Sequence, residues 1–156
     1  GVAQQKLFQD ITDEDWDRMF DINIKGVYRS IQAALPYLMK RERSRIVTFS
    51  SMWGQVGASC ESHYAASKGA VIALTQSLAK ELGPSGVRVN CVSPGTILTD
   101  MTAVLGQETL DALAEETPLE RNGSPEDAAR VAAFLCSEAA DFITGQVVAV
   151  NGGYIV

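Results

Sequence analysis

The sequence is poor in the residues that bind metals or form disulfide frameworks. Three cysteines and one histidine occur among 156 residues, and no two cysteines form a C-x-x-C pair. These counts argue against a metal site and against a disulfide scaffold. Unpaired thiols are typical of a reducing compartment, and we expect Cys91 and Cys136 to be small buried thiols.

Long apolar runs and large clusters of basic residues are also missing. No apolar stretch approaches the roughly 18 residues of a membrane-spanning helix, and the first residues do not read as a basic-then-apolar leader. The net charge is −6, from 19 acidic and 13 basic residues. Nucleic acids bind proteins largely through gathered Lys and Arg. The sequence therefore predicts a cytoplasmic protein with neither nucleic acid nor a membrane as its partner.

Length and composition are those of one globular domain. The chain is 46% hydrophobic and 21% charged, with 13 glycines and 5 prolines, close to the averages for soluble proteins. Domains commonly contain about 100–200 residues. We therefore take residues 1–156 as a single domain with a hydrophobic core.

Helical spacing of apolar residues appears in several segments. The first begins at Thr12, an N-cap residue followed by acids, and extends to about Met39, with a break expected near Asn23. The other predicted helices are Ser62–Leu82, a short one around Gln107–Glu116, and one from Ser124-Pro125 to Leu135.

Short β-branched runs between the helices predict three buried strands, Ile46–Phe49, Val87–Val92 and Gln146–Val150. A turn at Asn151-Gly152-Gly153 follows the third. Alternating strands and helices indicate an α/β fold with a parallel sheet covered by helices on both faces. In such folds, ligands bind at the carboxyl ends of the strands.

Chemistry-bearing residues occur at those predicted strand ends. Ser51 follows the first strand, and Pro94-Gly95 ends the second. Tyr64 and Lys68, four residues apart on the intervening helix, project from one face. Taken alone, the Tyr-x-x-x-Lys spacing is weak and could be an ordinary amphipathic pair, and Ser51 could be a turn residue. Convergence of all three on one crevice is the more informative expectation.

The motifs around these residues resemble the short-chain dehydrogenase/reductase family. The matching segments are Gly1-Val2, D-I-N-I-K-G, I-V-T-F-S-S, Y-A-A-S-K, R-V-N-C-V-S-P-G-T-I-L-T-D-M, P-L-E-R-N-G-S-P-E-D-A-A and T-G-Q-V-V-A-V-N-G-G. The resemblance covers essentially the whole chain. It implies a Rossmann-like doubly wound sheet, an NAD(P)-dependent oxidoreductase, and reduction of a ketone or the reverse reaction.

The resemblance also implies catalytic roles for Asn23, Ser51, Tyr64 and Lys68. Tyr64 would give a proton to the carbonyl oxygen, and Ser51 would orient that oxygen. Lys68 would lower the pKa of the Tyr64 phenol and bind the nicotinamide ribose. Asn23 would anchor a water, although it could simply break the helix.

Cofactor contacts are implied at seven positions, Gly1, Tyr64, Lys68, Pro94, Gly95, Ile97 and Thr99. Pro94, Gly95, Ile97 and Thr99 would line the nicotinamide, although Thr99 could only cap a local turn. NADP(H) is expected over NAD(H), and no metal is expected. Three neighbours are read as structural: Ser50 as a turn residue, Asn90 as a hydrogen-bonding residue within its strand, and His63 as a bystander on another helix face.

The loop between Ser51 and Tyr64 is expected to wall the substrate side. Substrate contacts are assigned to Ser51, Tyr64, Trp53 and Glu61, with the alternative that Trp53 is only a core residue. A serine hydrolase is disfavoured because Gly-x-Ser-x-Gly is absent.

Within the family, the chain looks most like 3-oxoacyl-carrier-protein reductases, which act on small or carrier-bound ketones. The segment W-G-Q-V-G-A-S-C-E also resembles a relative that reduces a ketone-bearing lysine modification on elongation factor P. The family's glycine-rich pyrophosphate turn does not occur in these residues. We therefore expect the C-terminal portion of a longer protein, a homotetramer or homodimer when full length. A truncated, non-catalytic interaction module remains the alternative from another class.

Overall fold

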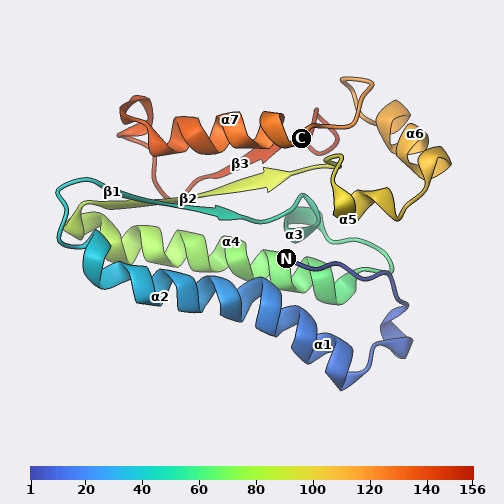
Figure 1. Ribbon diagram of the computed structural model, residues 1–156, viewed down its shortest axis with the longest axis horizontal. Helices are drawn as coiled ribbons and strands as arrows, with labels where there is room; N and C mark the ends of the chain where they lie inside the picture. Colours follow the sequence, from blue (N-terminus) through green and yellow to red (C-terminus); the bar gives the residue numbers. More distant parts are fainter.

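The computed structural model describes residues 1–156 as a three-layered α/β arrangement (Figure 1). Its sheet contains β1 (Ser44–Phe49), β2 (Val87–Pro94) and β3 (Val147–Val150), all parallel and in the order β1-β2-β3. Helices α2 (Gly26–Leu38) and α4 (Ser62–Leu82) lie against one face, and α7 (Pro125–Cys136) lies against the other. The predicted α/β class and parallel sheet are confirmed.

The remaining helices lie before and beyond the sheet. They are α1 (Asp13–Phe20), α3 (Trp53–Val56), α5 (Asp100–Ala103) and α6 (Gln107–Glu116). Thr12 caps α1 in a reciprocal arrangement with Asp15, and Ser124 caps α7 in the same way with Asp127. These caps satisfy backbone N–H groups that a helix start would otherwise leave without partners. Both helix starts predicted from the sequence are confirmed.

The predicted break near Asn23 is a widened turn inside a continuous helical path. A π-helical turn, Asp21–Lys25, joins α1 to α2 and contains Asn23, which is buried. Such turns insert one extra residue, so the side chains on either side rotate to new directions. The turn therefore aims Asn23 inward while Ile22 beside it stays 42% exposed.

Two apolar clusters hold the helices to the sheet. The first joins β1 and β2 to α4, with α2 packed against it, and contains Ile46, Ala79, Leu82, Val87 and Val89. The second joins β2 to α7 and contains Val92, Ala128 and Leu135. Alternate residues of β2 thus face opposite layers, which explains why this strand is buried along nearly its whole length.

Some details differ from the sequence-based expectations. β1 begins at Ser44, two residues earlier than predicted, because its register with β2 pairs Ser44 with Val87. Cys91 is buried, but Cys136 at the end of α7 is exposed, so the expectation of a second buried thiol was wrong. Helix α7 extends one residue beyond Leu135 and carries Cys136 on its outer side.

None of the helices combines the length and the apolar character needed to cross a membrane. The structure also contains no group of three or more His, Cys, Asp and Glu side chains arranged to hold a metal ion.

Candidate active site

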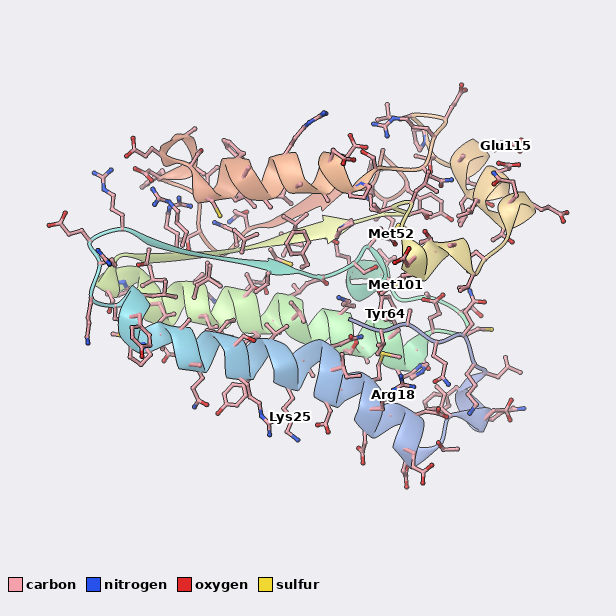
Figure 2. All side chains as sticks on the ribbon, viewed as in Figure 1. Arg18, Lys25, Met52, Tyr64, Met101 and Glu115 are labelled. Carbon is pink, nitrogen blue, oxygen red and sulfur yellow. The ribbon has the colours of Figure 1, made fainter.

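The carboxyl ends of β1 and β2 are joined by main-chain hydrogen bonds. Ser50 N–H donates to the Val92 carbonyl at 2.9 Å, and Met52 N–H donates to the Pro94 carbonyl at 2.9 Å. Figure 2 shows Tyr64, Met52 and Met101 gathered at this end of the sheet, from α4, the loop before α3, and α5. The residues expected to line a crevice therefore lie at this end of the sheet, where α3 packs on α4.

Ser51 and Tyr64 lie at this end of the sheet, and both are buried. Burial raises the pKa of the Tyr64 phenol, the hydrogen bond with Ser51 lowers it, and the nearby Glu61 carboxylate raises it further. The net pKa is above the usual tyrosine value, because a phenolate would lose its hydration inside the crevice. Tyr64 is therefore a proton donor, not a phenolate, throughout the neutral range.

Lys68 lies one turn after Tyr64. Its Nζ donates to the Phe49 carbonyl at 3.2 Å and lies 5.8 Å from the centroid of the Tyr64 ring. Burial lowers the pKa of this ammonium group. In this structure the pKa of Tyr64 is raised and not lowered as expected, and burial of the phenol is the largest cause.

Two small residues let Lys68 approach the end of β1. Ser50 Oγ donates to the Lys68 carbonyl at 2.8 Å, so Ser50 anchors α4 and is more than a turn residue. Gly54 of α3 packs against the Lys68 backbone, where a Cβ would lie 2.8 Å from the Lys68 carbonyl carbon. The absence of a side chain at Gly54 thus permits the close packing of α3 on α4.

Asn23 clamps the N-terminal segment. Its Oδ1 accepts from Val2 N–H at 2.8 Å, and its Nδ2 donates to the Val2 carbonyl at 2.9 Å and to Ser67 Oγ at 3.1 Å. The side chain therefore positions Val2, and the water expected at Asn23 stays a prediction. Gly1 is thereby placed beside Lys68, where a Cβ would lie 3.5 Å from Nζ.

The segment after β2 turns sharply at Gly95. Gly95 N–H donates to the Val150 carbonyl at 3.0 Å, and a Cβ there would lie only 2.8 Å from Asn151 Cα. Ile97 bridges Gly123. Thr99 is the N-cap residue of α5, and its N–H donates to Thr102 Oγ1 at 3.0 Å. Thr99 therefore caps α5, and its contact with the nicotinamide stays a prediction.

Trp53 begins α3, two residues after Ser51, and its N–H donates to Ser51 Oγ at 3.3 Å. The indole is partly buried and lies edge-on to Tyr154, with 5.9 Å between ring centroids. Trp53 is therefore only partly buried at the end of β1, and its contact with the substrate stays a prediction. Glu61 precedes α4 and accepts from Gln5 Nε2 at 3.2 Å. Sequence reasoning missed Tyr154, because no spacing pattern connects it with residues a hundred positions earlier.

The other two residues that were predicted to be structural, Asn90 and His63, also have structural contacts. Asn90 Nδ2 donates to the Ile143 carbonyl at 2.8 Å, and its Oδ1 accepts from Gln146 N–H at 3.0 Å. His63 is fully buried, with Nε2 2.9 Å from Gln4 Oε1. Neither takes part in the Ser51–Tyr64 arrangement.

Comparisons with known proteins identify a family and solved structures that this chain resembles. The family described as enoyl-(acyl carrier protein) reductase matches residues 1–155. A short-chain dehydrogenase/reductase from Brucella melitensis, also titled glucose/ribitol dehydrogenase, has a TM-score of 0.95 and 45% identity over 100% of this chain and 62% of its own. The chain belongs to the short-chain dehydrogenase/reductase family.

Other members of the family indicate the range of relatives. The 3-oxoacyl-(acyl-carrier-protein) reductase FabG of Aquifex aeolicus is 44% identical over 153 residues, which are 98% of this chain and 62% of that relative. A gluconate 5-dehydrogenase from Burkholderia cenocepacia, solved with NADP and tartrate, has a TM-score of 0.94 at 28% identity, covering 99% and 61% of the two chains. The chain thus spans a little over three fifths of the length of these short-chain dehydrogenases/reductases.

The nicotinamide cofactor implied by this family fits the residues at the strand ends. Gly1 lies beside Lys68, where a Cβ would be 3.5 Å from Nζ. Lys68 Nζ and the Tyr64 hydroxyl supply donors suited to ribose hydroxyls. No glycine-rich strand-to-helix turn of the kind that binds pyrophosphate occurs in the 156 residues. The donor set therefore suits the nicotinamide end of such a cofactor.

Proposed function

We propose that this chain carries the catalytic half of an NAD(P)-dependent oxidoreductase that interconverts a ketone and a secondary alcohol. The observation that supports this most directly is the convergence of Ser51, Tyr64 and Lys68 at the carboxyl end of β1. A buried phenol kept protonated, with a serine hydroxyl beside it, is suited to protonating a carbonyl oxygen. The cofactor, when bound, supplies the hydride that carbon receives.

In reduction, the chain's own residues act on the carbonyl oxygen. Ser51 Oγ already accepts from Trp53 N–H, so its proton remains available to donate to that oxygen. Tyr64 then transfers its proton as the oxygen gains negative charge, and the phenolate formed recovers a proton from solvent. Lys68 binds ribose hydroxyls and stabilises the transient phenolate, and its hydrogen bond to the Phe49 carbonyl holds the ammonium in the crevice.

The proposed substrate class is a 3-oxoacyl thioester, small or carrier-bound, with NADP(H) as the cofactor. Sequence similarity to FabG supports the substrate, and the relative solved with NADP supports the cofactor. The glycine-rich turn and the adenosine-binding residues are proposed to lie outside these 156 residues, and the complete protein is proposed to act in the cytoplasm as a homotetramer or homodimer.

One observation favours a second substrate class. Glu61 is close enough to raise the Tyr64 pKa, and the aromatic Trp53 stands on the same loop. A carboxylate and an aromatic ring together suit a positively charged substituent. This arrangement agrees with the resemblance to the reductase that acts on a ketone-bearing lysine modification of elongation factor P.

The test is NADPH oxidation by the full-length protein with two matched ketones. One is an acetoacetyl thioester, and the other is a ketone of similar length that carries a terminal ammonium group. Consumption of NADPH with the thioester and recovery of the 3-hydroxyacyl product support the first substrate class. Preference for the ammonium ketone supports the second class. Absence of turnover with both, in a folded protein that binds NADPH, would favour the non-catalytic interaction module.

A further inference from the structure

The substrate-side wall is connected to the C-terminal residues by a chain of contacts. Trp53 N–H donates to Ser51 Oγ, and the Trp53 indole lies edge-on to the Tyr154 ring at an interplanar angle of 87°. The Tyr154 hydroxyl in turn donates to Glu116 Oε2 at 2.7 Å. Glu116 is the last residue of α6, so the contacts extend from a surface helix to the proposed catalytic serine.

The backbone around Tyr154 is built to keep this arrangement in place. Gly152 and Gly153 adopt positive φ angles of 64° and 89° and pack against the segment that follows α6. A Cβ on Gly152 would lie 2.5 Å from Thr117 Cγ2, and Leu119 N–H donates to the Gly152 carbonyl at 3.2 Å. Figure 1 shows the chain end close to the loop between α6 and α7. Tyr154 therefore leaves a turn that is fixed relative to α6.

The Glu116 contact also keeps Tyr154 in its donor form. Hydrogen bonding to the carboxylate raises the pKa of the Tyr154 phenol, because ionisation would place two negative charges side by side. The phenol thus remains protonated and bonded across the neutral range. The Tyr154 ring is thus held at one end by Glu116 while it packs in a T-shaped arrangement with Trp53.

We propose that Tyr154, held by Glu116, is a positioning residue that fixes Trp53 beside Ser51 and so limits how large a ketone substituent the crevice accepts. The proposal rests on the proposed function for its kinetic part and on the Trp53–Tyr154 contact for its structural part. Edge-to-face aromatic pairs contribute about 0.5–1.5 kcal/mol. That range corresponds to roughly a two- to tenfold change in relative specificity.

The kinetic experiment compares a compact with a bulky 3-oxoacyl thioester in the full-length enzyme. Tyr154→Ala removes the ring, and we expect the ratio of kcat/KM for the bulky over the compact substrate to rise about five- to tenfold, with kcat for the compact substrate unchanged. Tyr154→Phe and Glu116→Ala should shift the ratio in the same direction by a smaller factor. Glu116→Gln should keep the wild-type ratio of kcat/KM, because an amide oxygen still accepts a hydrogen bond from the phenol.

A matched control is available on the same helix. Glu115 precedes Glu116 and is exposed, and Figure 2 shows it on α6 at the outer edge of the molecule. Glu115→Ala removes the same charge without removing the Tyr154 contact, so the substrate ratio should stay at the wild-type value. An equal loss for both substrates in Tyr154→Ala, or identical ratios in Glu115→Ala and Glu116→Ala, would overturn the proposal.

A spectroscopic readout separates this proposal from the proposed function. These 156 residues contain two tryptophans, so Trp16→Phe, with any tryptophan outside them also replaced by Phe, leaves Trp53 as the only tryptophan. In that background, Tyr154→Ala and Glu116→Ala should shift the Trp53 emission to the red and increase its quenching by acrylamide, whereas Glu115→Ala should not. Unchanged Trp53 emission overturns the positioning role. Inactivity of the wild type towards every ketone, with the emission shift present, overturns only the proposed function.

Discussion

Lys68 Nζ donates to the Phe49 carbonyl at 3.2 Å while lying 5.8 Å from the centroid of the Tyr64 ring. The ammonium is thus tied to the last residue of β1 and stands beside the phenol without contacting its hydroxyl. This placement gives the two side chains separable roles. In the proposed mechanism, Tyr64 donates the proton, and Lys68 is the cation that a bound ribose and a transient phenolate would share.

Replacement of Tyr64 by Phe should remove the proton donor and keep the ring. We expect ketone reduction by the full-length protein to fall at least about 10²-fold, the usual contribution of a general acid. Cofactor affinity should be nearly unchanged, as measured by fluorescence titration with NADPH. A variant that retains half of the wild-type turnover would remove Tyr64 from the mechanism.

Lys68→Ala should weaken both turnover and cofactor affinity. Because burial lowers the pKa of Lys68, its ammonium loses the proton below the ordinary lysine value of about 10.5. The wild-type affinity for NADPH should therefore decline as pH rises through that lowered pKa, and the variant should show no such decline. Titrations across the alkaline range measure this difference. Superimposable profiles with equal affinities would contradict the role given to Lys68.

Asn23→Ala should release the N-terminal segment. The side chain is 2% exposed and forms hydrogen bonds to both backbone groups of Val2 and to Ser67. We expect a loss of about 2–4 kcal/mol in unfolding free energy, since buried partners are left without bonds, together with weaker NADPH binding because Gly1 moves. Ile22→Ala, in the same π-helical turn but exposed, is the control and should cost little in a denaturant titration.

Gly95→Ala should disrupt the turn that follows β2. The added Cβ would lie 2.8 Å from Asn151 Cα, a contact with backbone that cannot rotate away. We expect a destabilisation of about 2 kcal/mol or more and a loss of turnover. Gly26→Ala is a suitable control, because its Cβ would lie 3.7 Å from the Asp21 carbonyl oxygen, an ordinary contact. Similar melting temperatures for both variants would show that the turn tolerates a side chain.

The 156-residue chain by itself should show no measurable nicotinamide binding and should self-associate. The pyrophosphate requires a glycine-rich turn at a helix N-terminus, and the residues present contact only the nicotinamide end. β1 is an edge of the sheet, with Phe49 46% exposed, which favours association between chains. Calorimetric titration with NADPH and NADH, together with sedimentation, tests both expectations. A monomeric chain that melts cooperatively and binds either cofactor at micromolar concentration would contradict them.

Much of the site was predictable because its signals are local. The four-residue spacing of Tyr64 and Lys68 puts both on one helical face, and Ser51 follows a recognisable β-branched strand. Capping residues such as Thr12 and Ser124 marked helix starts for the same reason, since a cap is bonded to a residue three positions away. The structure brings all of these residues to the positions expected of them.

Other features depend on contacts between distant parts of the chain. The Tyr64 pKa was expected to be lowered, whereas it is raised, chiefly because the folded chain buries the phenol. Cys136 was expected to be buried because cysteines usually are, but the outer face of α7 decided its exposure. The contact of Asn23 with Val2 was not foreseen either, because the two residues are 21 positions apart.

The sequence by itself determined the order of helices and strands, the position of the strand ends, and the residue types that can protonate a ketone. These follow from periodicity, capping and spacing, which act over a few residues. Only the tertiary structure decided which of those residues come into contact and which have shifted pKa values. It also decided that Tyr154 contacts both Trp53 and Glu116. Desolvation and side-chain packing arise when segments far apart in the chain share one volume, so no local pattern of the sequence encodes them.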